Sequence, residues 1–306
     1  MKISKNTKSP DQPREEFMKR IKVHYYHFVV PKAAPPIADV LKALEQQDLK
    51  QREKLCGFQT IRLDEISERN LADGSVNWLL KFSKFRDDNW PGVTAAGQPA
   101  KDLELEDGEI LSEETVAIYS TKNDRLVIQY NHYGVRASKI REYLNLGIAE
   151  PAKQYSLSPI LTNEALEKYQ KKQIVTSIDA CIEGISEADL AVMQGTGLEG
   201  ALRKSIENKA TKFQFKFSVD ARVKKNKVER GWVATIVDAI TNRAGDNDSL
   251  QVTAKENEED TAELIDLLES RKFTEFNADQ VDRTLGRRYD SNQLFGILDQ
   301  CLKQWT

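Results

Sequence analysis

The chain has 306 residues, of which 40% are hydrophobic and 30% are charged, and 45 Lys and Arg against 48 Asp and Glu leave a formal net charge of −3. This composition excludes a collagen-like or wholly disordered protein, and the length is typical of two domains. Three widely separated cysteines exclude a disulfide framework and a cysteine-rich zinc site, so we expect a cytoplasmic protein. No run of about 18 apolar residues occurs, so we expect no membrane insertion.

The first half of the chain predicts strands and packed helices. Residues 21–30 (IKVHYYHFVV) are β-branched and aromatic, which is typical of a strand buried on both faces. Residues 37–44 place apolar side chains at helical spacing, and residues 76–82 alternate as a half-buried strand does. Residues 115–131 contain two strand patterns around a Thr-Lys-Asn-Asp turn, which predicts a hairpin. A helix is expected from about Ser138.

We expect an α+β protein with two domains, each a mainly antiparallel sheet with packed helices. The polar stretch that follows Pro151 is typical of a linker, so the boundary is placed at residues 151–160. The N-terminal domain then covers residues 19–150, and the C-terminal domain covers residues 161–306. Residues 1–18 are predicted to be a disordered basic tail, without the apolar region of a secretory signal.

The second half contains the strongest strand pattern. Residues 212–223 alternate Phe, Val and Ala with Lys, Gln, Ser, Asp and Arg, so one face should be buried and the other wet and basic. Residues 228–240 predict a helix directly afterwards. Ser186–Asp189 resembles a helix-capping box. Residues 291–305 repeat apolar side chains at helical spacing, which indicates a core helix or a dimer helix.

Charge is unevenly distributed in this half. Residues 201–243, here the basic segment, hold eleven basic and four acidic residues, a local charge of +7. Residues 246–269, here the acidic segment, hold nine acidic residues and one lysine, a local charge of −8. Like charges at short spacing repel, so the segregation favours an external polyanion for the basic segment. Neutralisation by the acidic segment within the fold is the alternative.

We therefore predict that the chain binds double-stranded DNA without sequence preference. Helix N-termini and basic side chains favour phosphate, and phosphate contacts carry little sequence information. Affinity should then fall steeply with salt. The predicted phosphate contacts lie on the basic strand and at the start of the following helix: Lys212, Lys216, Arg222, Lys224, Lys225, Lys227 and Arg230.

Other motifs are weaker, and we predict no catalytic site, no metal and no cofactor. Gly195–Gly200 matches GxGxxG with Asp220 twenty residues later, but the residues before it have helical spacing. A helix end and a loop are therefore favoured over a nucleotide site, which stays open. His24 and His27 should point to opposite faces of a strand and cannot share a metal. Residues 131–138 could seat an anion, although a plain connection is favoured.

Two further function classes stay open. An enzyme could use the glycine loop for a nucleotide, or it could be a metal-dependent nuclease that uses carboxylates such as Asp179 and Glu183 near Lys209 or Lys212. A protein-interaction module could instead use the acidic segment, presenting it to a partner in place of DNA.

The order of features resembles RexA-like phage-exclusion proteins and the KwaB proteins of the Kiwa anti-phage defence system. The first half shares LEDGEILSEE, then the hairpin VAIYSTKNDRLVIQYN and the helix SKIREYL; the second shares ATKFQFKFSVDARVKKNKV, SLQVTAKENEED and NQLFGILDQCL. The resemblance implies a cytoplasmic DNA-binding homodimer from a prophage or defence island. A membrane effector or a phage protein would be a further partner. It supplies no catalytic residues.

Overall fold

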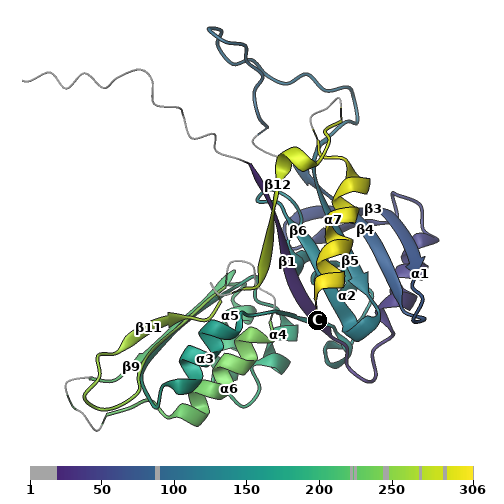
Figure 1. The fold of residues 1–306 in the computed structure, drawn as a ribbon. Coiled ribbons are helices and arrows are strands. Elements are labelled where there is room, and N and C mark those ends of the chain that lie inside the picture. The colour runs from purple at the N-terminus through teal and green to yellow at the C-terminus, as the bar shows by residue number, and fades with distance from the viewer. Residues whose placement is uncertain are drawn as a thin grey trace, which may run out of the picture.

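The computed structural model describes residues 19–86, 90–220, 223, 226–243, 248–268, 271–284 and 288–305, and every structural statement below concerns these residues. The predicted tail, residues 1–18, lies outside them. The chain is α+β, as predicted, with two antiparallel sheets of eight and four strands and seven α-helices (Figure 1). Within the described part, no helix is both long and apolar enough to cross a bilayer.

The first sheet has the strand order β12-β1-β6-β5-β4-β3-β2, and β7 also pairs with β1. The predicted hairpin is present as β5 and β6, joined by a 3₁₀ turn in which Asn123 and Asp124 have positive φ angles of 60° and 49°. These two residue types tolerate that conformation best after glycine. The strands of this sheet are β1 (Arg20–Val29), β2 (Glu53–Cys56), β3 (Gln59–Asn70), β4 (Val76–Arg86), β5 (Leu111–Ser120), β6 (Arg125–Tyr130), β7 (Ser156–Pro159) and β12 (Phe273–Asn277).

Helices cover both faces of the first sheet. Alternation along β1 sends Tyr26 and Phe28 into a core beneath α1 (Ile37–Glu45) and α2 (Ala137–Asn145). Val23 and Tyr25, earlier in the same strand, belong to a second core beneath α7 (Ser291–Gln304). This arrangement explains why β1 is rich in β-branched and aromatic residues, as expected for a strand with helices packed against both faces over much of its length.

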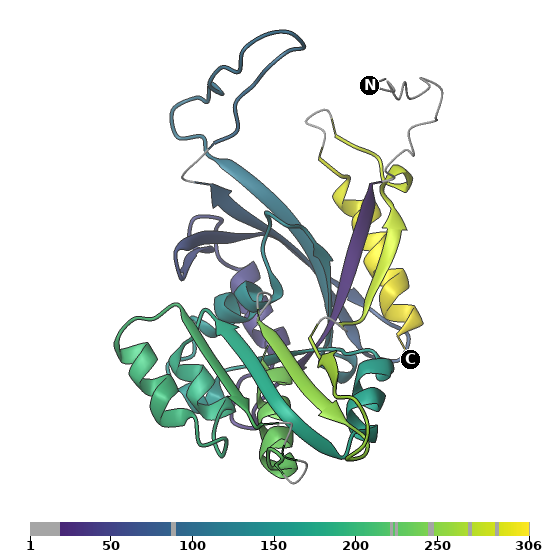
Figure 2. The ribbon, with the colours of Figure 1, turned by 90° about the vertical axis from the view of Figure 1, so that its left-hand side faces the viewer.

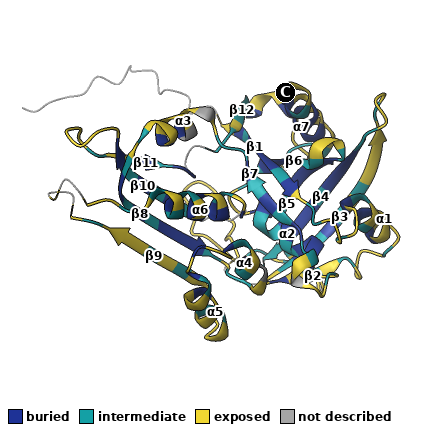
Figure 3. Cartoon of the chain, turned by 90° about the horizontal axis from the view of Figure 1, so that it is seen from below, coloured by how far each residue is buried: buried dark blue, intermediate teal, exposed yellow. Residues whose placement is uncertain are grey.

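The second sheet has the order β11-β10-β8-β9 and is covered on one face. Its strands are β8 (Ile174–Glu183), β9 (Lys212–Ser218), β10 (Ser249–Lys255) and β11 (Glu263–Asp266). Residues of α3 (Asn163–Lys171), α5 (Glu199–Glu207) and α6 (Arg230–Thr241) share a core with the sheet, and the short α4 (Glu187–Val192) follows β8. Figure 2 shows the opposite face turned to the viewer without a helix over it, and Figure 3 shows β9 as an exposed edge strand beside the buried β8.

The second sheet and its helices form an insertion in the first unit. The chain leaves β1 after β7 and returns to it as β12, so the two connections run side by side. Ile160 N donates to Tyr25 O at 2.9 Å, and Lys272 N donates to Ile160 O at 2.6 Å. The structure thus groups residues differently from the predicted span 161–306, because β12 and α7 pack on the first sheet. An apolar helical stripe reveals that a face is buried but not which sheet buries it.

Candidate nucleic-acid interface

Four of the seven predicted phosphate-binding residues are described by the structure. Lys212 and Lys216 lie on β9 with side chains 51% and 61% exposed. Lys227 is exposed in the segment before α6, and Arg230 is the first residue of that helix. The other three predicted residues lie outside the described part of the chain: Arg222, Lys224 and Lys225.

The outward face of β9 is wet, as expected, but it is not basic. Cross-strand register places Lys212 opposite Glu183 and Lys216 opposite Asp179 on β8. The Lys212–Glu183 and Lys216–Asp179 ion pairs measure 3.6 and 3.1 Å. Exposed pairs of this kind contribute only about 0–1 kcal/mol to stability, yet each places a negative charge beside a lysine and so offsets the positive charge that the face presents to a partner. The expectation of a basic face is therefore wrong, because the neighbouring strand supplies carboxylates.

The acidic segment forms ion pairs mainly with lysines at the end of α3 and directly after it. Lys172 Nζ lies 2.9 Å from Glu263 and 3.5 Å from Glu256, and Lys168 Nζ lies 3.7 Å from Glu263. Arg230 is bonded elsewhere: its guanidinium donates to Gln170 O at 2.8 Å and to Gln173 Oε1 at 3.2 Å. Arg230 therefore holds the start of α6 against the end of α3, which leaves fewer of its N–H donors for phosphate, although both acceptors are neutral and its charge is not cancelled.

A buried ion network joins the basic and acidic segments at one point. Arg243 Nε donates to Asp189 Oδ1 at 2.8 Å, and its Nη1 forms a short bond to Asp248. Asp189 also completes the predicted capping box, because its carboxylate accepts from Ser186 N at 2.7 Å. Burial alone would raise the pKa of the Asp189 carboxyl, but the attraction of Arg243 and Arg141 holds it below its ordinary value.

The glycine motif is a connection between helices. Gly195 and Gly197 have φ angles of 82° and 75°, values that favour glycine, and they follow α4 instead of a strand. Gly195 N donates to Glu199 Oε1 at 2.5 Å, and Trp232 Nε1 donates to Thr196 O at 2.6 Å. The strand-turn-helix context that a dinucleotide fingerprint requires is absent from these described residues.

The two candidate nuclease carboxylates are separated along one strand. Asp179 and Glu183 lie four residues apart on the outward face of β8, which places their backbones about 13 Å apart. Each of them faces a lysine of β9, as described above. A single metal ion is therefore out of reach for both carboxylates at once.

A row of alternating aromatic and basic side chains crosses one end of the first sheet. His24 of β1 stacks on Tyr130 of β6, with ring centroids 4.8 Å apart and planes inclined by 19°. The Arg136 guanidinium carbon lies 4.3 Å from the Tyr130 ring centroid on the approach to α2. Phe273 of β12 lies 6.3 Å from His24, centroid to centroid, and Lys22 Nζ lies 4.8 Å from the Phe273 centroid.

The row continues through the loop between β6 and α2. Arg136 Nη2 donates to His132 O at 3.1 Å, and the His132 and Tyr133 ring centroids are 5.0 Å apart. The Arg86 guanidinium carbon of β4 lies 5.8 Å from the Tyr133 centroid. We call these eight residues the aromatic–cation row: Lys22, His24, Arg86, Tyr130, His132, Tyr133, Arg136 and Phe273.

The row lies where the helices stop covering the sheet. On the face of β1 that packs against α1 and α2, Phe28 and Tyr26 are buried, whereas His24 and Lys22 are half-buried. The rings at the two ends of the row are the most open, since Tyr133 is 59% exposed and Phe273 is 48% exposed. The row is therefore an internally ordered surface whose terminal rings are accessible to a partner.

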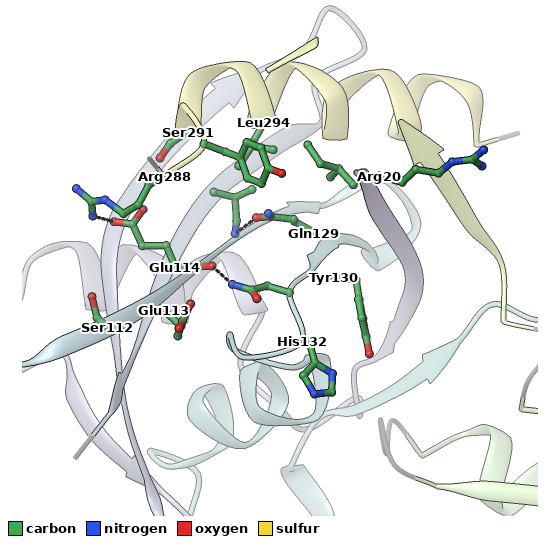
Figure 4. A pocket seen from close by; sticks show the side chains of 14 residues that line it. Arg20, Ser112, Glu113, Glu114, Gln129, Tyr130, His132, Arg288, Ser291 and Leu294 are labelled. Atoms are coloured by element: carbon green, nitrogen blue, oxygen red, sulfur yellow. Dashed lines mark hydrogen bonds and ion pairs between the residues drawn. The ribbon is translucent and has the colours of Figure 1, made fainter. Parts of the chain in front are cut away.

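A cavity of about 320 Å³ adjoins the row on the α7 side of the sheet (Figure 4). Tyr130 and His132 lie at its rim, on the side away from α7. Its charged lining is already paired: Arg288 Nη1 donates to Glu114 Oε1 at 2.6 Å, and Arg20 pairs with Glu275 at 2.5 Å. Two cations of the row are paired in the same way, because Lys22 Nζ lies 3.2 Å from Glu275 and Arg86 Nη1 lies 3.3 Å from Glu113. The row therefore differs from the cavity in its open aromatic rings and not in unpaired charge.

Comparison with known proteins gives a family. The model of a family of unknown function, DUF6731, matches residues 19–304. The chain belongs to this family. A search of curated proteins found no match, so the resemblance to phage-exclusion and Kiwa proteins stays a prediction.

The family match spans both sheets, from β1 to α7, and it includes every residue of the aromatic–cation row. Sequence reasoning missed the row because its members come from four strands and a loop that are far apart in the chain. Two local signals were present, the HYYH run in β1 and the NHYGVR run before α2. Neither run shows by itself that Tyr130 would meet His24 and Arg136.

Proposed function

We propose that this DUF6731 protein binds nucleic acid without reading its sequence. The observation that carries the proposal is the aromatic–cation row. Proteins that hold nucleic acid non-specifically combine cations that follow the backbone with aromatic rings on which bases stack. The row offers both on one surface, with two open rings at its ends and three Lys or Arg side chains between or beside the rings. Two of these cations, Lys22 and Arg86, share their charge with Glu275 and Glu113. Stacking is tolerant of sequence because every base has a π-face.

The basic segment supports the same proposal through phosphate. Lys227 is exposed and makes no ion pair with a described residue, so its charge is available to duplex DNA. Lys212 and Lys216 contribute less than the sequence predicts, because each shares its charge with a carboxylate of β8. Double-stranded DNA therefore remains a proposed ligand through phosphate contacts, and the row adds affinity for unpaired stretches.

The biological setting is also proposed, on the resemblance alone. It is phage exclusion or anti-phage defence by a cytoplasmic homodimer, with a membrane effector or a phage protein as a further partner. Light scattering on the purified chain tests the dimer, and pull-down from infected cells tests the further partner. A monomer at micromolar concentration would contradict the dimer without affecting the row.

The decisive experiment is fluorescence anisotropy with labelled 20-nucleotide DNA, single-stranded and duplex, in two unrelated sequences and over a range of salt. We expect binding to all four probes, with affinity that falls as salt rises. Tyr133→Ala and Phe273→Ala should each weaken single-strand binding about tenfold, since stacking contributes about 1–3 kcal/mol per base. Leu264→Ala removes an apolar side chain of β11 that is 59% exposed outside the row and is the control.

Three results would count against parts of the proposal. No retention of any probe at low salt rejects nucleic-acid binding outright. Equal single-strand affinity in Tyr133→Ala and Leu264→Ala rejects the row as the contact surface. Duplex binding that is unaffected by Lys227→Glu rejects the basic segment as a phosphate-contacting surface. Incubating the protein with plasmid and Mg²⁺ or Mn²⁺ then distinguishes DNA cleavage from DNA binding alone.

A further inference from the structure

A second cavity lies between the two units, separate from the row. It has a volume of about 700 Å³. One wall comes from α2 and the turn between β2 and β3, and the other comes from the turn after β8 and the segment between α5 and β9. Pockets of this size, set between two structural units, commonly accommodate small organic molecules.

Arg141 of α2 is the unusual residue of this cavity. Its side chain is only 10% exposed, yet its nearest carboxylate oxygen, Asp189 Oδ1, is 4.0 Å away. Asp189 is already engaged by Arg243 and Ser186, and no described residue accepts a hydrogen bond from the Arg141 guanidinium. Burial also lowers the pKa of Arg141. A buried guanidinium that lines a cavity without an acceptor indicates that an anion completes the site.

The charge of the cavity wall indicates which anion fits. Four cations and two carboxylates line it, which leaves a net charge of +2. Two of these cations are held locally, because Lys139 donates to Glu142 at 2.7 Å and Lys212 lies 3.6 Å from Glu183. Lys209 is exposed and forms no ion pair with a described residue. A phosphate monoester carries nearly two negative charges at neutral pH, whereas a carboxylate carries one.

The remainder of the wall mixes polar side chains with an apolar part that is open to solvent. Phe58 is 89% exposed and Leu146 is 49% exposed, and Ile185 and Ile206 contribute further aliphatic surface. An exposed phenyl ring at the mouth of a cationic cavity suits a planar or apolar group attached to the anion. The lining therefore matches a molecule with one phosphate end and one apolar or aromatic end.

We propose that this cavity binds a phosphate monoester with an aromatic or apolar body, the chemical class of a nucleoside monophosphate, and that Arg141 binds its phosphate. The ligand contacts both units, so its binding also stabilises their arrangement. The site is independent of the row and does not require the proposed nucleic-acid binding.

Isothermal titration calorimetry on the full chain tests the site with AMP, inorganic phosphate and adenosine. We expect AMP to bind, phosphate to compete with it, and adenosine to bind at least tenfold more weakly. Arg141→Met should lower AMP affinity at least tenfold, and Lys209→Gln should lower it about threefold, in keeping with the loss of charge-assisted hydrogen bonds. Thermal melting of each variant identifies loss of folding, and Lys209→Gln at the exposed residue keeps the test valid if Arg141→Met unfolds.

Arg203→Gln, at an exposed residue of α5 outside the cavity, is the control and should bind AMP as the parent does. The proposal is overturned if neither AMP nor phosphate binds at millimolar concentration, or if adenosine binds as tightly as AMP. It is also overturned if AMP affinity depends on Tyr133 and not on Arg141 or Lys209, since the row would then be the site. Arg141→Met should leave oligonucleotide binding unchanged, which separates this proposal from the preceding one.

Discussion

The two sheets of this protein use their faces in different ways. The first is buried between α1 and α2 on one side and α7 on the other, and its functional surface is the strip that these helices leave uncovered. The second is covered on one side, and its open face carries paired lysines and carboxylates. The sheet that contains the basic segment thus presents mixed charge, whereas the first sheet places three cations beside aromatic rings, two of which, Lys22 and Arg86, also pair with carboxylates. Linear charge density is a poor guide to surface potential when neighbouring strands are unknown.

The largest expected effect concerns the buried ion network. Asp189→Asn should lower the free energy of unfolding by about 3–5 kcal/mol, because it leaves buried Arg243 and Arg141 partly uncompensated. Asp179→Asn on the open face of the same sheet should cost about 0–1 kcal/mol. Urea denaturation measures both. Equal losses of unfolding free energy would show that burial of Asp189 does not make its ion pairs more important for stability than the exposed pair of Asp179.

The same variant makes a prediction about pH. The folded-state pKa of Asp189 lies below its ordinary value, so its stabilising contribution is present above the ordinary carboxyl pKa and is lost as pH falls through the folded-state value. The stability of the parent should therefore decline in acid more steeply than that of Asp189→Asn. Asp248, whose pKa burial raises, is present in both proteins and does not explain a difference. If the stabilities of the parent and Asp189→Asn fell in parallel as pH decreased, the lowered pKa of Asp189 would be contradicted.

The next effect tests the grouping of α7 with the first sheet. Leu298 is fully buried in the core between α7 and that sheet, so Leu298→Ala should cost about 2–5 kcal/mol. Leu264 of β11 is 59% exposed, and Leu264→Ala should change stability by less than about 0.5 kcal/mol. Hydrogen exchange on Leu298→Ala should show faster exchange in β5 and β6 than in β8 and β10. If only the second sheet lost protection from exchange, the packing of α7 against the first sheet would be contradicted.

A smaller effect compares the lysines of the basic segment. Lys227→Gln should reduce the salt dependence of duplex binding by nearly one phosphate contact, since the slope of log affinity against log salt is about 0.9 per contact. Lys216→Gln should change it less, because Asp179 lies 3.1 Å from the Lys216 ammonium and already offsets its charge. Salt-titrated anisotropy measures both slopes. A larger effect for Lys216→Gln would restore the outward face of β9 as the main contact surface.

The smallest expected effect concerns a thiol in the first core. Cys56 is fully buried, and burial raises the pKa of its thiol to about 12. The thiolate is the reactive form, so iodoacetamide at pH 8 should modify Cys56 slowly in the folded protein and rapidly in urea. Mass spectrometry after timed labelling checks this. Rapid labelling without urea would show that the core around β2 and α2 opens readily.

The sequence by itself determined the secondary structure and its class. The β-branched and aromatic run of β1, the hairpin of β5 and β6, the capping box at Ser186 and the apolar stripe of α7 are local patterns, and each is present in the structure. Such patterns depend on backbone geometry with a period of two or 3.6 residues, which a single segment displays without knowledge of its partners. The α+β class follows from their order.

Only the tertiary structure decided what those segments meet. Strand register put Glu183 opposite Lys212, brought Tyr130 between His24 and Arg136, and left Arg141 in a cavity without an acceptor. The return of the chain to β1 as β12 likewise assigned α7 to the first sheet. Contacts between residues far apart in the chain depend on which strand edges and sheet faces pair. The free energy of that pairing comes from the whole core, so no single segment determines it.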